Sequence, residues 1–191
     1  MLGLNTRRGD LAQKQNGLSA LPDAVDAARA AIEEAVDYAV ATGTRAVHVM
    51  AGFAEGQAAH ETFCANLAFA AERAAGHGIT ILIEPLNRYD APGYFLTTTS
   101  QAAGVIEAVG AANLKLMFDC YHVQLMEGDI THKLKALKPI VGHIQFASAP
   151  DRGPPDHGEL NFRHVFDAIA AEGYTMPLGA EYKPVGDTDA T

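Results

Sequence analysis

The chain contains no tryptophan, two cysteines and no excess of positive charge. Cys64 and Cys120 are far apart and lack the C-x-x-C spacing of a zinc or redox motif, so we expect two reduced thiols. The 191 residues carry 14 Lys and Arg against 23 Asp and Glu, a net charge of −9. This balance argues against nucleic acid as a partner, because phosphate binding needs a basic surface.

Long apolar runs are also missing. No segment approaches the roughly 20 residues that cross a bilayer, and residues 1–10 lack the apolar core of a signal peptide. We therefore expect no membrane partner and, with reduced thiols, a cytoplasmic protein.

Short β-favouring runs alternate with longer, mostly Ala-rich segments that have helical periodicity. Strands are predicted over residues 2–5, 46–50, 79–84, 114–119, 140–147 and 177–182. Helices are predicted over residues 23–41, 58–75, 99–109, 129–137 and 162–172. Most strands are apolar on both faces, as in a parallel sheet covered by helices. No break in composition divides the chain, so one α/β domain over residues 1–191 is expected.

Two architectures share this pattern, the doubly wound open sheet and the (β/α)8 TIM barrel. Neither G-x-G-x-x-G nor G-x-x-x-x-G-K-[ST] occurs at a βα turn. A nucleotide-binding doubly wound domain is therefore excluded.

Oxygen-bearing side chains stand at the ends of four successive predicted strands: Glu84, Asp119, Gln145 and Glu181. In a barrel these ends meet at one rim. Three carboxylates brought together from apolar strands would repel one another and lose hydration, and a divalent cation offsets both costs. Oxygen ligands favour Mg²⁺ or Mn²⁺ over zinc. The alternative is that each acid only caps a following helix.

Longer segments resemble a known family. They are HVMAG (48–52), IEPLNRYDAPGYFL (83–96), NLKLMFDCYHVQLMEGD (113–129), GHIQFASAPDR (142–152), HGELNF (157–162) and EYKP (181–184). Together they resemble the hydroxypyruvate isomerase family of xylose-isomerase-like TIM barrels. The resemblance implies that Glu84, Asp119, Gln145 and Glu181 bind the metal and that Glu84 and Glu181 transfer protons.

The reaction implied is the interconversion of hydroxypyruvate and tartronate semialdehyde through a metal-stabilised enediolate. Two carboxylates flanking the substrate suit this chemistry, because one proton leaves a carbon and another reaches its neighbour. Residues 3–22 and 149–162 also resemble 2-oxo-tetronate isomerases, whose substrate is one carbon longer. Gln145 favours an isomerase over related ketose 3-epimerases, which tend to have histidine at that position. A non-catalytic remnant is the remaining alternative.

Three further residues are candidates for binding this small hydroxy-oxo acid. His122, three residues after Asp119, is interpreted either as a partner of a substrate oxygen or as a surface or helix-capping histidine. Arg152 lies in a Pro- and Gly-rich loop, where it either binds the substrate carboxylate or stays solvated. His48 lies within a predicted strand and either lines the pocket or packs in the core.

A complete barrel has eight βα units and about 250 residues. We expect this chain to form about six units of such a barrel, without the N-terminal units and the last helix. Such a sheet would expose apolar edges, which a second copy of the chain in a homo-oligomer would cover.

Overall fold

Six parallel strands form one sheet in the order in which they occur along the chain. The structure is a computed structural model, and it describes residues 2–10, 12–13, 15–184 and 186. The strands are β1 (Leu4–Asn5), β2 (Ala46–His48), β3 (Thr80–Ile83), β4 (Leu114–Asp119), β5 (Val141–Phe146) and β6 (Gly179–Ala180). Each strand pairs in parallel with the next strand of the chain. The predicted αβ barrel architecture of six units is confirmed.

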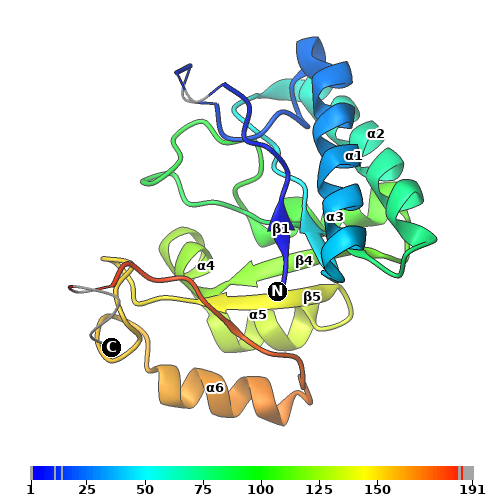
Figure 1. Cartoon of the computed structure of the whole chain (residues 1–191). Coiled ribbons are helices and arrows are strands. Elements are labelled where there is room, and N and C mark those ends of the chain that lie inside the picture. Colours follow the sequence, from blue (N-terminus) through cyan, green and yellow to red (C-terminus); the bar gives the residue numbers. More distant parts are fainter. Residues whose placement is uncertain (1, 11, 14, 185, 187–191) are drawn as a thin grey trace.

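Helices cover one face of this curved sheet (Figure 1). A 3₁₀ turn, η1 (Pro22–Ala24), leads into α1 (Val25–Thr42). The others are α2 (Gly56–Ala75), α3 (Thr99–Val109), α4 (Cys120–Met126), α5 (Ile130–Leu137) and α6 (Phe162–Ala171). In Figure 1, α1, α2 and α3 lie to the right of the strands, and α5 and α6 lie below them.

Local signals set both ends of helix α3. The Thr98 side chain accepts a hydrogen bond from the Gln101 amide and begins α3, and Gly110, at φ 68°, ends it. The prediction of a helix over 99–109 is therefore correct at both ends. The helix predicted from residue 23 begins two residues later, because Pro22–Ala24 forms the tighter 3₁₀ turn.

Two kinds of prediction are wrong. The sequence patterns predict no helix over 120–126, where α4 follows β4 without a connecting loop. Asp119 makes this junction possible, because it ends the strand and its side chain caps the helix at the Tyr121 amide. Five strands are also shorter than predicted, β6 most of all, since the parallel ladder ends before the apolar run does.

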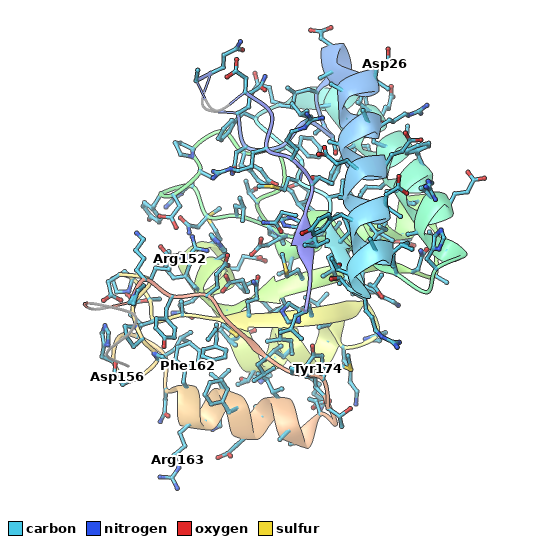
Figure 2. The ribbon with its side chains drawn as sticks, viewed as in Figure 1. Asp26, Arg152, Asp156, Phe162, Arg163 and Tyr174 are labelled. Atoms are coloured by element: carbon cyan, nitrogen blue, oxygen red, sulfur yellow. The ribbon has the colours of Figure 1, made fainter. Side chains whose placement is uncertain are left out.

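Successive side chains along each strand point to opposite faces of the sheet, one toward the hydrophobic core and the next toward the pocket. Leu114, Leu116 and Phe118 of β4 are fully buried against the helices, whereas Met117 faces the pocket. On α6, Phe162 points toward the sheet and Arg163 away from it (Figure 2). The sheet therefore buries one face in the core and lines a pocket with the other.

The outermost strands, β1 and β6, contain two residues each. Coverage of these edges by a second copy of the chain stays a prediction. Among the described residues, no helix combines the length and the apolar character needed to cross a membrane.

Candidate active site

A pocket of about 750 Å³ is lined by residues of the sheet face opposite the hydrophobic core. Its wall includes alternate residues of successive strands, among them His48, Leu82, Met117 and Gln145. The carboxylates of Glu84 and Glu181 lie at its carboxyl-terminal end, immediately after β3 and β6. Active sites of parallel barrels occupy this position.

Glu84 is buried, with an exposed fraction of 6%. Its Oε1 atom has no hydrogen-bond partner, and its Oε2 atom lies 3.8 Å from Nδ1 of His48. Burial raises the pKa of the Glu84 carboxyl well above its ordinary value, and the charges of Asp119 and Glu181 raise it further. This carboxylate therefore needs either a proton or a cation.

Asp119 is held by the start of α4. Its Oδ1 atom accepts a hydrogen bond of 2.8 Å from the Tyr121 amide, whereas its Oδ2 atom is buried and has no hydrogen-bond partner. Burial raises the pKa of Asp119 to about 7, against the effect of the Tyr121 amide. One oxygen thus anchors the side chain and leaves the other directed at the site.

Gln145 and Glu181 approach from the neighbouring strands. Gln145 pairs in register with Asp119, and its Oε1 atom is buried without a hydrogen-bond partner. Glu181 is about half exposed, and its Oε2 atom accepts a hydrogen bond of 2.9 Å from Nη2 of Arg152. Three of the four residues predicted at the metal, Glu84, Gln145 and Glu181, line the same pocket, although Glu181 is engaged by an arginine. Asp119 lies beside them, with a carboxylate oxygen within 4.8 Å of a carboxylate oxygen of Glu84.

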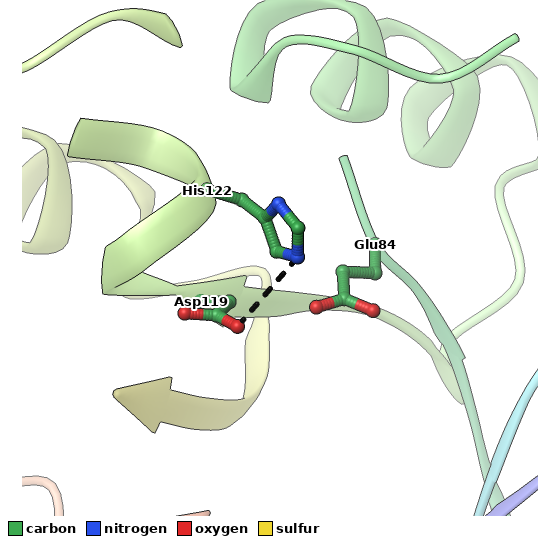
Figure 3. A group of neighbouring side chains, drawn as sticks. All are labelled: Glu84, Asp119 and His122. Carbon is green, nitrogen blue, oxygen red and sulfur yellow. Dashed lines mark ion pairs between the residues drawn. The ribbon is translucent and has the colours of Figure 1, made fainter. Parts of the chain in front are cut away.

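His122 completes the most compact group of the site (Figure 3). One ligand atom each of Glu84, Asp119 and His122 lies within 4.8 Å of the other two. Nε2 of His122 is 3.9 Å from Oδ2 of Asp119, and burial lowers the pKa of the ring to about 3. The interpretation of His122 as a surface or capping histidine is wrong, because the side chain is buried and directed at the carboxylates.

The other two predicted pocket residues also face the site. His48 is buried, with Nδ1 3.3 Å from Oδ1 of Asn5, and burial lowers its pKa to about 4. Arg152, labelled in Figure 2, pairs with Glu181 and lies 3.5 Å from Oδ2 of Asp90. Its guanidinium also stacks over the Tyr121 ring, 5.2 Å from the centroid. Arg152 is therefore not a solvated loop residue.

The pocket residues fit a divalent cation. Within the described part of the chain, six buried side-chain nitrogen or oxygen atoms lack a hydrogen-bond partner. Five of them belong to this site, on His48, Glu84, Asp119, His122 and Gln145. Buried polar atoms normally have hydrogen-bond partners, so the three oxygens among these five are free to bind a cation, and the two ring nitrogens are free to contact a bound molecule. The oxygens of Glu84, Asp119 and Gln145 suit a hard cation such as Mg²⁺ or Mn²⁺.

Sequence reasoning missed Asn87 and Asp90. Asn87 is fully buried and contacts His122, and Asp90 accepts a hydrogen bond of 3.0 Å from the Tyr121 hydroxyl. Both lie in the long segment between β3 and α3, where no strand periodicity indicates which side chains turn inward. The one available signal was their closeness to Glu84 in the sequence.

The six-unit parallel sheet and the acidic pocket at its carboxyl end define a TIM-barrel enzyme of the xylose isomerase-like type. The chain belongs to the xylose isomerase-like TIM barrel family, which it matches over residues 6–190.

Curated relatives of the chain within this family are isomerases. The chain is 44% identical over 190 residues to a 2-oxo-tetronate isomerase of Cupriavidus necator, covering 97% of the chain and 73% of the relative. It is 37% identical over 191 residues to the hydroxypyruvate isomerase of Escherichia coli, covering 97% and 74%.

Solved structures agree on the fold. A crystal structure from Brucella melitensis, described as an AP endonuclease of family 2, is 38% identical with a TM-score of 0.95. That comparison covers 99% of this chain and 74% of the other. An L-ribulose 3-epimerase is 26% identical with a TM-score of 0.76, over 87% of this chain and 58% of the other.

Proposed function

We propose that this isomerase interconverts an aldehyde and a ketone on adjacent carbons of a small hydroxy-oxo acid. The substrate proposed first is hydroxypyruvate, converted to and from tartronate semialdehyde, as the name of the Escherichia coli relative suggests. A four-carbon 2-oxo-tetronate is the second candidate, and the 44% identity to the Cupriavidus necator protein favours it.

The observation that carries the proposal is the group of buried oxygen atoms without hydrogen-bond partners on Glu84, Asp119 and Gln145, in a pocket that Glu181 also lines. Isomerisation removes a proton from a carbon next to a carbonyl group and returns one to the neighbouring carbon. Glu84 and Glu181 are proposed as the two groups that carry these protons. Burial raises the pKa of Glu84 in the metal-free chain, and a bound cation would lower it again and so keep the carboxylate ionised for proton abstraction.

A divalent cation would be held by Glu84, Asp119, Gln145 and Glu181. When bound, it supplies positive charge beside the two adjacent substrate oxygens, where negative charge develops during proton transfer. The role of the chain is to present these oxygens from successive strand ends and to exclude water from Glu84 and Asp119, which are 6% and 1% exposed.

Arg152 is proposed to bind the substrate carboxylate. The guanidinium of Arg152 lies 3.5 Å from Asp90 and 2.9 Å from Glu181. The longer contact, with Asp90, is the weaker of the two, so a substrate oxygen would replace Asp90 more easily than Glu181. His48 and His122 remain neutral near pH 7, because burial lowers the pKa of each. They are therefore proposed as neutral hydrogen-bonding groups for substrate oxygens.

The test is an NMR assay of the full chain with Mg²⁺ or Mn²⁺, given hydroxypyruvate and 2-oxo-tetronate separately. We expect turnover of at least one acid, and its loss in Glu84→Gln and in Glu181→Gln. Glu61→Gln, on the exposed side of α2 where Glu61 contacts Gln57, is the matched control and should keep the wild-type rate. Unchanged turnover in either site variant would remove that glutamate from the mechanism. No turnover by a wild-type protein that Mg²⁺ stabilises would favour the non-catalytic alternative.

A further inference from the structure

The orientation of the Asn87 side chain is fixed by its own chain segment. Its Oδ1 atom accepts hydrogen bonds from the backbone amides of Tyr89, at 3.0 Å, and Asp90, at 2.9 Å. A backbone amide can only donate, so the atom facing these two amides must be the oxygen. The amide nitrogen Nδ2 then faces the other way, 3.2 Å from Oδ2 of Asp90 and 2.8 Å from Nδ1 of His122.

Two donors therefore converge on one ring nitrogen of His122. Besides Nδ2 of Asn87, the backbone amide of Asn87 donates a hydrogen bond of 3.0 Å to Nδ1 of His122. A nitrogen that accepts from two N–H groups uses its lone pair and carries no proton. The proton of the neutral imidazole must then be on Nε2, the atom that faces Asp119 and Glu84 in Figure 3.

We infer that Asn87 is a positioning residue that fixes the tautomer of His122, so that His122 presents an N–H donor, and no lone pair, to the pocket. A neutral histidine binds a metal ion through the lone pair of the unprotonated nitrogen. His122 is thus not a ligand, although its Nε2 atom lies within 4.8 Å of the Glu84 and Asp119 carboxylates. The cation is left with oxygen ligands.

The consequence for catalysis rests on the proposed function. In an isomerase, a fixed N–H donor beside the carboxylates would hydrogen-bond the substrate oxygen on which negative charge develops. Asn87 would then act on the reaction only through His122. Its fully buried side chain keeps water from competing for Nδ1.

The tautomer can be measured in the wild-type protein without substrate. In the metal-free wild-type protein with ¹⁵N-labelled histidine, long-range ¹H–¹⁵N correlation distinguishes a protonated from an unprotonated ring nitrogen. The His122 signals are identified by their loss in His122→Gln. We expect Nε2 protonated and Nδ1 unprotonated, and the same pattern after Mg²⁺ is added. A proton on Nδ1, or loss of the Nε2 proton on adding Mg²⁺, would overturn the inference whether or not the protein is an isomerase.

Asn87→Asp tests the residue itself. A carboxylate in place of the amide has no N–H to donate to Nδ1 and would accept a proton from it, which leaves the backbone amide of residue 87 as the one donor to this nitrogen. The fraction of the Nδ1–H tautomer should therefore rise. The kcat should fall by up to about 100- to 1,000-fold, the effect of losing one donor to a substrate oxygen that gains negative charge, with a smaller change in KM. Asn66→Asp is the matched control, because Asn66 is also fully buried and its amide donates to a carbonyl, that of Ser19, away from the pocket.

The control separates loss of stability from loss of position. Asn66→Asp should reduce the melting temperature but keep the His122 tautomer and kcat. If Asn87→Asp folds and also keeps the wild-type His122 tautomer and the wild-type kcat, Asn87 does not position His122.

Discussion

Replacing Asp119 with asparagine should stabilise the metal-free protein at pH 8 and abolish its stabilisation by Mg²⁺. Asp119 is 1% exposed, and its Oδ2 atom lacks a hydrogen-bond partner. Asparagine keeps an oxygen that can accept the hydrogen bond from the Tyr121 amide, so the cap of α4 is retained. The substitution therefore changes the charge with little change in shape.

The magnitude follows from the pKa of Asp119. Burial raises this pKa from 3.8 to about 7, so the folded protein binds the proton more tightly than the unfolded chain does. Stability from this group is therefore present below pH 4 and is lost as the pH rises through 7. At pH 8 the ionised carboxyl costs at most about 4 kcal/mol of stability. At pH 5 the folded protein keeps this carboxyl protonated, and taking up the proton costs about 2 kcal/mol. The neutral amide of the Asp119→Asn variant would avoid both costs.

The assay is urea unfolding at pH 5 and pH 8, in EDTA and in Mg²⁺. In EDTA the advantage of Asp119→Asn should be larger at pH 8 than at pH 5. Mg²⁺ at a hundred times its Kd should add about 2.7 kcal/mol to the wild type and nothing to the variant. Asp167→Asn, on the exposed side of α6, is the control and should match the wild type. A variant that is less stable than the wild type at pH 8 in EDTA would refute the reasoning.

Two further predictions concern the pocket and its support. Arg152→Lys should raise the KM for the acid substrate about tenfold with a smaller effect on kcat, because lysine cannot form two parallel hydrogen bonds to a carboxylate. Steady-state kinetics measure both constants. An unchanged KM would contradict the binding of the substrate carboxylate by Arg152. Gly17→Ala should lower the free energy of unfolding by more than about 2 kcal/mol. Gly17 has a φ of +114°, and a Cβ atom there would lie 2.5 Å from the Met50 carbonyl oxygen. A variant that unfolds at the same urea concentration as the wild type would contradict this prediction.

The sequence contains enough to predict the sheet, every long helix and the strand-end residues. Glu84, Asp119, Gln145 and Glu181 each stand at the end of an apolar run, and parallel strands bring such ends together whatever the loops do. The α3 bounds were predictable because Thr98 and Gly110 are local end signals.

The remainder depends on contacts between segments far apart in sequence. Asn87 and His122 are 35 residues apart, and only the packed structure shows that two donors meet on one ring nitrogen. Helix α4 was not predicted because Asp119 is both the last residue of β4 and the N-cap of α4, whereas a sequence pattern assigns a residue to one element. The engagement of Arg152 by Glu181 joins residues 29 positions apart, so it too had no local signal.

Each strand pairs with the next strand of the chain, so neighbouring positions around the pocket come from consecutive segments of the sequence. Every proposed ligand comes from a separate βα unit, so evolution or an engineer can exchange one contributor while its neighbours keep their backbone. A histidine in place of Gln145, for instance, would change the hardness of the donor set at a single unit. Such a scaffold can diversify its chemistry one position at a time.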